Sequence, residues 1–364
     1  MVKPIRVLVV DDSLFMRRMI SDLLVQDPEI AVVGTARNGQ EGLELAKQLK
    51  PDVITLDVEM PVMDGLTMLG KLMQEQPTPV LMLSSMTTEG AEVTLKALEL
   101  GAVDFVAKPS GSISLDIYKI SSQIIEKVKA VARARMGVFR RPLSVSPTQA
   151  VVSSPPTPSS VPISSVPSHR APLVVIGSST GGPRALTTLL GQIPQGMPAK
   201  MLVIQHMPEG FTKSLAERLN RLSPFNIYEA QGGETLQVGT AYIAPGGSHL
   251  KVQRGGMLQL SQDPPVHGVR PAVDITLFSI AQNYEGPLLV AILTGMGSDG
   301  SAGVRTLHSK GARILAEDEN SCVVFGMPRA AIATGCVHRV VPIEGMAQAI
   351  NEEVSQLCNR TSAA

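Results

Sequence analysis

Residues 172–191 read PLVVIGSSTGGPRALTTLLG, and this stretch decides the fold of the second half of the chain. A short run of apolar and β-branched residues enters a glycine-rich turn, and a helical pattern follows the turn. Pro183 falls early in that helix, where proline is tolerated because the first helical N–H groups have no partner within the helix. A buried strand that passes directly into a helix is typical of a βα unit in a parallel sheet.

The sequence on the carboxyl side of this stretch repeats the pattern. Apolar runs of strand length occur at 171–177, 199–205, 240–246 and 286–295, and helical patterns separate some of them. The spacing predicts a doubly wound α/β domain with its own core over residues 171–364.

Residues 137–170, on the amino side of this domain, have a different composition. They contain seven prolines and nine serines but no aspartate or glutamate. Proline-rich sequence of this kind cannot bury a core and favours extended, semi-rigid conformations. We therefore predict a flexible linker over this range.

Strand and helix patterns also alternate before the linker. Five short apolar runs have strand length and β-branched content, at 5–10, 30–36, 52–57, 79–84 and 103–108. Five βα units predict a second α/β domain over residues 1–136, built on a five-stranded parallel sheet with helices on both faces.

Composition excludes several classes of protein. Thirty-two basic residues balance thirty-two acidic ones, and aromatic residues make up only 3%, so neither a nucleic-acid partner nor attraction to an anionic membrane surface is expected. Asp11 ends the longest apolar run near the start, which predicts no signal peptide, no membrane insertion and a cytoplasmic location. The odd number of cysteines fits reduced thiols in that compartment; they are Cys322, Cys336 and Cys358.

Polar residues end four of the strands predicted before the linker. Functional groups gather at the carboxyl ends of parallel strands, so these side chains are expected to converge at one edge of the sheet. Carboxylates that close together need a cation, and Mg²⁺ suits a set of oxygen ligands that also receives a phosphoryl group. Single residues of this kind are often only solvated turn residues, but the set includes five: Asp11, Asp12, Asp57, Ser84 and Lys108.

These residues lie in the motifs VVDDS, LDVEMPVMDG, MLSS and AKP, and this part of the chain resembles a response-regulator receiver domain. The resemblance implies a flavodoxin-like fold with strand order 2-1-3-4-5 and a histidine kinase of a chemotaxis system as phosphodonor. It implies that Asp57 accepts the phosphoryl group and that Ser84 and Lys108 bind its oxygens. The Mg²⁺ ligands that it implies are Asp11, Asp12, Asp57 and the carbonyl of Glu59.

A possible nucleophile lies in the stretch quoted first. Gly177, Ser179 and Gly181 fit the spacing G-x-S-x-G, which places a serine on a sharp strand-to-helix turn with its hydroxyl exposed. Ser178 competes for this role. A glycine turn at the start of a helix can also serve tight packing or bind a phosphate, so this motif alone leaves the function open.

A nucleophilic serine needs a base, and the base needs a carboxylate that orients it. His206 follows the predicted strand 199–205, which favours it over the other four histidines of this domain, at 249, 267, 308 and 338. Asp299 lies in a glycine-rich loop after the apolar run 286–295, although it can also be interpreted as a helix N-cap. Asp274 is the alternative carboxylate.

The second domain resembles the catalytic domain of the chemotaxis protein-glutamate methylesterase family. The motifs that carry the resemblance are IGSSTGGP, QHMPEGFTKSLAERLN, YIAPGG, RPAVD, LTGMGSDG and CVVFGMPRAA. The resemblance implies hydrolysis of glutamate methyl esters and deamidation of specific glutamines on the cytoplasmic domains of chemoreceptors, without a cofactor for the esterase reaction. It supports Ser179 as nucleophile, His206 as base and Asp299 as its orienting acid. The oxyanion donors that it suggests are the backbone N–H groups of Met296 and Thr180.

The two halves together predict a hydrolase activated by phosphorylation, in which the receiver covers the Ser179 cleft until Asp57 is phosphorylated. A response regulator whose output is binding alone is the alternative, and it predicts that Ser179→Ala keeps full function. An anion-binding domain is less favoured because GSSTGG lacks the lysine of a P-loop, and no basic stripe supports a DNA-binding output.

Overall fold

The computed structural model describes residues 3–85, 87–108, 117–137 and 171–363. The chain divides into two compact units, Met1–Arg140 and Arg141–Ala364. The predicted linker, apart from its first residue, lies outside the described residues, and its boundaries stay a prediction.

The first unit is built on a parallel sheet of five strands in the order β2-β1-β3-β4-β5. The order confirms the flavodoxin-like fold. The strands are β1 (Ile5–Val10), β2 (Ile30–Ala36), β3 (Val53–Asp57), β4 (Val80–Ser84) and β5 (Asp104–Ala107).

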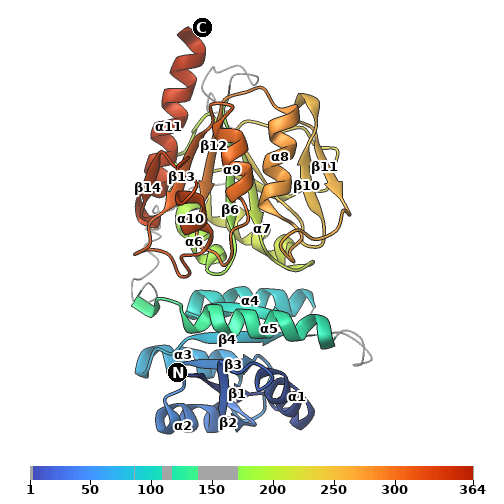
Figure 1. Ribbon diagram of the computed structural model, residues 1–364, viewed down its shortest axis with the longest axis vertical. Helices are drawn as coiled ribbons and strands as arrows, with labels where there is room; N and C mark the ends of the chain where they lie inside the picture. Colours follow the sequence, from blue (N-terminus) through green and yellow to red (C-terminus); the bar gives the residue numbers. More distant parts are fainter. Residues whose placement is uncertain (1–2, 86, 109–116, 138–170, 364) are drawn as a thin grey trace, which may run out of the picture. The chain divides into compact units, whose positions relative to one another are not determined.

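Helices cover both faces of this sheet (Figure 1). They are α1 (Leu14–Leu24), α2 (Gly39–Leu49), α3 (Gly65–Glu75), α4 (Thr88–Leu100) and α5 (Ile117–Ala132). Helix α1 packs on α5, whereas α3 packs on both α2 and α4. The first four helices begin where a polar side chain accepts a hydrogen bond from a free N–H group of the first turn, and these N-caps are Ser13, Asn38, Asp64 and Thr87.

The second unit contains a parallel sheet of seven strands in the order β14-β13-β12-β6-β7-β9-β8. The central strands are buried along their whole length, as expected for a sheet covered on both faces. The strands are β6 (Leu173–Ser178), β7 (Lys200–Gln205), β8 (Asn226–Glu229), β9 (Thr240–Ile243), β12 (Leu288–Ile292), β13 (Arg313–Glu317) and β14 (Arg339–Val341).

The helices of the second unit form two groups. Helix α6 packs on α7 and α11, and α9 packs on α8 and α10. An antiparallel hairpin, β10 (His249–Val252) with β11 (Leu258–Ser261), packs on α8. This arrangement (Figure 1) confirms the doubly wound α/β fold; the helices are α6 (Gly182–Leu190), α7 (Phe211–Leu222), α8 (Val273–Asn283), α9 (Ser301–His308), α10 (Met327–Ile332) and α11 (Ile343–Ala363).

The sheet has more strands than the apolar runs predicted. Strands β8, β13 and β14 and the hairpin lie outside those runs. Strand β6 is the first in the chain, yet it lies in the middle of the sheet with β7 on one side and β12 on the other. The strand order therefore reverses between β6 and β12, and ligands of open α/β sheets bind at such a switch point, beyond the carboxyl ends of the strands.

Candidate active site

Ser179 lies directly after β6, in a turn that only glycines permit. Gly181 has a φ of 80°, which is the left-handed region that favours glycine, and α6 begins at Gly182. Ser179 is partly exposed, whereas Ser178 is fully buried and donates its hydroxyl hydrogen to Gln205 Oε1 at 2.7 Å. The structure thus favours Ser179 over Ser178 as the nucleophile.

A buried amide joins the end of β6 to the end of β7. Gln205 Nε2 donates to the carbonyl oxygens of Ser179 at 2.9 Å and His206 at 3.0 Å, and only 2% of Gln205 is exposed. A Cβ atom at Gly182 would lie 1.9 Å from Gln205 Oε1, so any larger residue there would have to displace this amide. No sequence pattern indicates this role of Gln205, because an amide beside a histidine looks the same whether its side chain is buried and bonded or exposed on the surface.

His206 and Asp299 form the contact that the predicted triad requires. His206 Nε2 lies 2.8 Å from Asp299 Oδ2, and the two side chains are 9% and 2% exposed. Asp299 also accepts hydrogen bonds from three backbone N–H groups, those of Val273, Asp274 and Gly300. Asp299 thus accepts hydrogen bonds from the first residues of α8 and from the N-cap residue of α9 as well as from the histidine.

The pKa of Asp299 lies below its ordinary value. Burial acts in the opposite direction, but the hydrogen bond and charge of His206, together with the N–H groups of Asp274 and Val273, outweigh it. The carboxyl group therefore stays ionised, which is the form that orients an imidazole and stabilises an imidazolium.

The strands also bring Ser179 and His206 to adjacent positions. Ser178 and Gln205 are register partners on β6 and β7, and the His206 N–H donates to the Ser178 carbonyl oxygen at 3.0 Å. Within the described residues, no hydrogen bond joins Ser179 Oγ to the His206 ring. Because Nε2 faces Asp299, Nδ1 is the ring nitrogen left to accept the serine proton, and such contacts are often long without substrate.

The predicted oxyanion donors lie on two loops beside Ser179. The Ser179 N–H donates to the Thr294 carbonyl oxygen at 3.0 Å, which ties the serine to the loop that holds Met296. No hydrogen bond in the part of the chain that the structure describes uses the Met296 N–H, and Thr180 is buried in the turn itself. The oxyanion assignment remains a prediction that this geometry supports.

We expect Gly295→Ala to lower both stability and activity. Its Cβ would lie 2.5 Å from Met327 Sδ and 2.8 Å from Ser179 Cβ, so the serine must move. Such overpacking costs about 1–3 kcal/mol, and a misplaced nucleophile lowers kcat by roughly 10- to 100-fold. Thermal unfolding and methyl-ester hydrolysis measure the two effects. The control is Gly345→Ala in α11, where the added Cβ meets only Val341 Cγ1 at an ordinary 3.4 Å; equal behaviour of the two variants would contradict the prediction.

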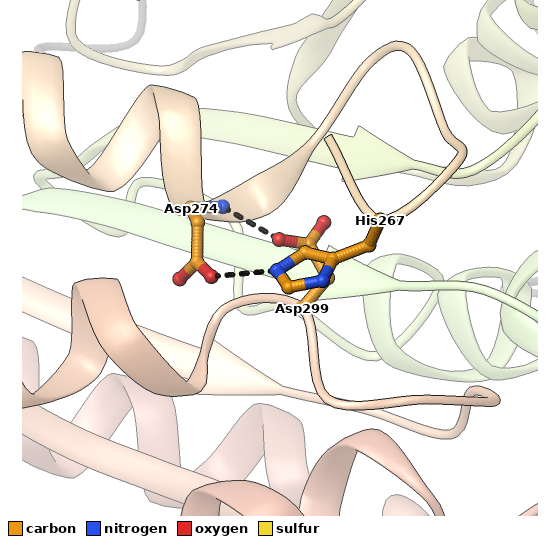
Figure 2. A group of neighbouring side chains, drawn as sticks. All are labelled: His267, Asp274 and Asp299. Atoms are coloured by element: carbon orange, nitrogen blue, oxygen red, sulfur yellow. Dashed lines mark hydrogen bonds and ion pairs between the residues drawn. The ribbon is translucent and has the colours of Figure 1, made fainter. Parts of the chain in front are cut away.

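The alternative carboxylate, Asp274, lies beside Asp299, and Figure 2 shows its backbone nitrogen bonded to Asp299 and its carboxylate bonded to His267. His267 Nε2 is 3.4 Å from Asp274 Oδ2, and Gly303 N donates to Asp274 Oδ1 at 2.7 Å. Burial is the main cause that raises the pKa of Asp274, and the charge of Asp299 adds to it. Among the described residues no hydrogen bond joins Asp274 to His206, and the backbone N–H of Asp274 donates to Asp299 instead.

The same three residues, His267, Asp274 and Asp299, have the composition of a metal site, with ligand atoms within 4.8 Å of one another. Both oxygens of Asp299, however, already accept two hydrogen bonds each, one of them from His206. A cation would have to displace the histidine. We therefore interpret the group as a hydrogen-bonded support of Asp299.

The other histidines are held in structural positions. The ring of His249 accepts from Ala272 N and contacts Pro264 O, and the whole residue is buried. His338 Nδ1 accepts from Ile314 N, and its ring lies 5.3 Å from that of His308. None of these contacts brings the ring of His249, His308 or His338 to Ser179, so His206 is the candidate base.

The first unit brings three of its predicted site residues into contact. Lys108 Nζ lies 2.7 Å from Asp57 Oδ1 and 2.9 Å from Asp11 Oδ2. Burial raises the pKa of Asp57 to about 6, although Lys108 lowers it, and the nearby Asp11 raises it further. A carboxylate held in this way, next to a lysine, can accept a phosphoryl group whose oxygens the lysine then binds.

The acidic residues of this unit fit a divalent cation. Carboxylate oxygens of Asp11, Asp12 and Asp57 lie within 4.8 Å of one another, and Asp12 is exposed. These hard oxygen donors suit Mg²⁺, which keeps positions open for water and phosphoryl oxygens. Glu59 is exposed on the loop after β3, and the role of its carbonyl group stays a prediction.

Ser84 faces a different partner. Its hydroxyl donates to the Gly90 carbonyl oxygen at 3.1 Å and accepts from Thr94 Oγ1 at 2.6 Å, so it contacts α4 rather than Asp57. To bind a phosphoryl oxygen, the Ser84 hydroxyl would have to break its hydrogen bonds to α4 and turn toward Asp57. No sequence pattern indicates that the hydroxyl is bonded to α4.

An enzymatic α/β domain with serine, histidine and aspartate at its switch point, joined to a unit with an acidic phosphoacceptor site, defines a response regulator with a hydrolase output. The profile of the response regulator receiver domain matches residues 7–117, and that of the CheB methylesterase matches residues 174–350. The chain belongs to the CheB methylesterase family, in the form that carries a receiver domain.

Several relatives match almost the whole chain. The protein-glutamate methylesterase/protein-glutamine glutaminase of Symbiobacterium thermophilum is 47% identical over 361 residues, which cover 97% of this chain and 98% of that protein. The protein of the same name from Geobacillus kaustophilus is 49% identical and covers 97% and 100%. The solved catalytic domain of Thermotoga maritima CheB methylesterase is 44% identical, with a TM-score of 0.48, over 50% of this chain and 97% of that one.

Proposed function

We propose that the chain is a phosphorylation-activated protein-glutamate methylesterase that also deamidates specific glutamines on chemoreceptors. The hydrogen bond from His206 Nε2 to Asp299 Oδ2, beside the Ser179 turn, carries the proposal. Because the resemblance places the substrate glutamates on cytoplasmic receptor domains, we expect the enzyme to act in the cytoplasm. Among the described helices, none combines the length and the apolar character that a membrane span needs.

Hydrolysis takes place in two steps at Ser179. Its hydroxyl oxygen attacks the ester carbonyl while His206 Nδ1 takes the proton, and the N–H of Met296 stabilises the oxyanion. Collapse of the intermediate breaks the bond to methanol, which receives that proton from His206. A water molecule then repeats the sequence and releases the glutamate side chain; with a glutamine substrate, ammonia leaves instead of methanol.

The receiver unit supplies the control. The Asp57 carboxylate attacks the phosphorus of a phosphohistidine on the kinase, the bond from phosphorus to the histidine nitrogen breaks, and an acyl phosphate forms. Lys108 then lies where it can hold a phosphoryl oxygen. Asp11, Asp12 and Asp57 would hold Mg²⁺, which would neutralise charge on the phosphoryl oxygens. Asp57, Asp11 and Lys108 already lie together, which supports this assignment.

Asp57→Ala is expected to abolish activation without abolishing the basal esterase. Removal of the carboxylate leaves no atom to phosphorylate, whereas Ser179 and His206 belong to the other unit. Methanol release from methylated receptor membranes, with and without a small-molecule phosphodonor and Mg²⁺, measures the effect. A tenfold activation needs a free-energy difference of only about 1.4 kcal/mol between the less active and the more active arrangement of the protein. We therefore expect the phosphodonor to stimulate the wild type clearly.

Asp52→Ala is the matched control for this experiment. Asp52 lies at the opposite end of β3, where it accepts a hydrogen bond from Arg6 N. The esterase activity of the Asp52→Ala variant should respond to the phosphodonor like that of the wild type. Equal stimulation of the Asp57→Ala variant would contradict the assignment of Asp57.

A further inference from the structure

Glu317 is a buried carboxyl group that the proposed mechanism does not use. It is the last residue of β13 and is 0% exposed. Its Oε2 accepts from the Thr294 N–H at 2.8 Å, and its Oε1 accepts from Ser321 Oγ at 2.9 Å. Both carboxyl oxygens are therefore engaged.

The contact with Thr294 replaces a missing hydrogen bond of the sheet. Strands β12 and β13 pair as far as Ile292 and Ala316, and β12 ends there. The next backbone groups turn to β6, where Leu293 N donates to Gly177 O. The N–H of Thr294 would have no acceptor in the ladder, and a buried unpaired N–H costs roughly as much as a lost hydrogen bond. The side chain of Glu317 supplies that acceptor.

Thr294 is the residue through which the nucleophile turn and the oxyanion loop are joined. Its carbonyl oxygen accepts from Ser179 N at 3.0 Å, and its hydroxyl donates to the Thr180 carbonyl oxygen at 3.0 Å. The same hydroxyl accepts from Val324 N at 3.0 Å. Two residues later follows Met296, whose N–H is the predicted oxyanion donor. Displacement of the Thr294 peptide would therefore move both the nucleophile and its oxyanion donor.

We propose that Glu317 is a positioning residue of the hydrolase, which acts through the Thr294 peptide to hold Ser179 and the Met296 N–H at the spacing that the oxyanion needs. This inference rests on the proposed function. Glu317 does not touch the substrate. Its carboxyl oxygen supplies the hydrogen-bond acceptor that a neighbouring strand would supply if the pairing of β12 and β13 continued to Thr294.

The carboxyl group can do this in its neutral form. Burial raises the pKa of Glu317 to about 7, against the effect of hydrogen bonds from Thr294 N, Ser321 Oγ and Cys322; the charge of Glu344 on α11 raises it further. A protonated Oε1 can donate to Ser321 Oγ, whose hydrogen is then free for the Asp318 carbonyl oxygen at 3.2 Å. Oε2 meanwhile keeps its bond to Thr294.

An amide reproduces this neutral arrangement. In Glu317→Gln, the side-chain oxygen can accept from Thr294 N while the NH₂ group donates to Ser321 Oγ. Glu317→Leu has a similar size but no acceptor, and Glu317→Asp keeps the acid but is one methylene shorter. The three variants separate acceptor, charge and reach.

The test measures kcat and KM for methyl-ester hydrolysis by the full chain, and the rate at which a small fluorophosphonate labels Ser179. Glu317→Gln is expected to keep kcat within about threefold of the wild type. Glu317→Leu and Glu317→Asp should lower kcat by roughly 10- to 100-fold, with KM within about threefold, because a misaligned oxyanion donor weakens the transition state. The labelling rate should fall in parallel with kcat.

Glu353→Leu is the matched control. Glu353 is likewise buried, 2% exposed, but it is bonded to Arg313 at the opposite end of β13. This variant should lose stability and keep kcat. The proposal is overturned if Glu317→Leu and Glu317→Asp keep kcat, if Glu317→Gln loses as much as they do, or if Glu353→Leu lowers kcat equally. Absence of esterase activity in the wild type would count against the proposed function instead.

The pH dependence of thermal stability is a second test of the proposal, and it does not depend on enzyme activity. The raised pKa of Glu317 means that the folded state keeps a proton that the unfolded chain releases between its ordinary value of 4.5 and about 7. Stability from this group therefore decreases as pH rises through that window. The Tm of Glu317→Gln relative to the wild type should increase from pH 5 to pH 8. A difference that does not change with pH would contradict a carboxyl group held mainly neutral at Thr294.

Discussion

Ser179→Ala is expected to lower methyl-ester hydrolysis by at least about 10⁴-fold, with the fold intact. The variant loses the only atom that forms the covalent bond to the substrate, and the oxyanion donors and binding contacts alone supply a small residual rate. Ser179 is partly exposed and its hydroxyl makes no hydrogen bond within the described residues, so its removal should change Tm little. Methanol release and thermal unfolding are the measurements.

Ser178→Ala is the matched control, since it removes the hydroxyl of the adjacent residue. That hydroxyl donates to Gln205 Oε1 inside the protein. Its loss should cost about 1–3 kcal/mol of stability and leave kcat within roughly tenfold of the wild type. The opposite result, with Ser178→Ala inactive and Ser179→Ala active, would exclude the assigned nucleophile. Full function of Ser179→Ala in adaptation would support an output by binding alone.

Asp299→Asn should lower kcat by about 10⁴-fold, the magnitude known for loss of the acid in a serine triad. Both Asp299 oxygens accept hydrogen bonds, Oδ2 from His206 and Val273 N, Oδ1 from Asp274 N and Gly300 N. An amide has only one oxygen, so its NH₂ group must replace either Oδ2 or Oδ1 and would then face two N–H donors instead of accepting from them. His206 then loses its acceptor, or the loop loses two backbone bonds.

Asp274→Asn tests the alternative carboxylate with the same chemical change. Burial already raises the pKa of Asp274, so an amide is a closer substitute there. We expect kcat to stay within roughly tenfold of the wild type. The kcat values of both variants and the pH profile of hydrolysis should be compared with that of the wild type. A larger loss in Asp274→Asn than in Asp299→Asn would reverse the two roles.

The sequence predicted those features that local patterns determine. Runs of β-branched residues predicted nine strands of the two sheets, because parallel strands are buried on both faces and need continuous apolar residues. The polar residues that end such runs or directly follow them, Asp11, Asp57 and His206, then had to lie at the carboxyl edges of their sheets. Within the first sheet this edge brings Asp11 and Asp57 together, and within the second sheet it brings His206 beside Ser179, without any knowledge of side-chain contacts.

The features that the sequence did not predict depend on tertiary contacts. The short edge strand β8 and the two strands of the hairpin β10–β11 have only four residues each, which is too few for a clear period. Gln205 and Glu317 are polar residues at buried positions, where only the partner across the sheet explains them. The direction of the Ser84 hydroxyl depends on Thr94, which lies on the following helix.

The orientation of the His206 ring has a practical consequence for the comparison of hydrolases. The atom nearer the tip of the imidazole faces the acid, so the neutral ring carries its proton on Nε2. Geometric templates built on enzymes in which Nε2 faces the nucleophile will overlook this centre, although the same three groups are present. Nitrogen-15 spectroscopy of the resting enzyme, which distinguishes the two tautomers, provides a signature that separates such reversed centres from the familiar ones.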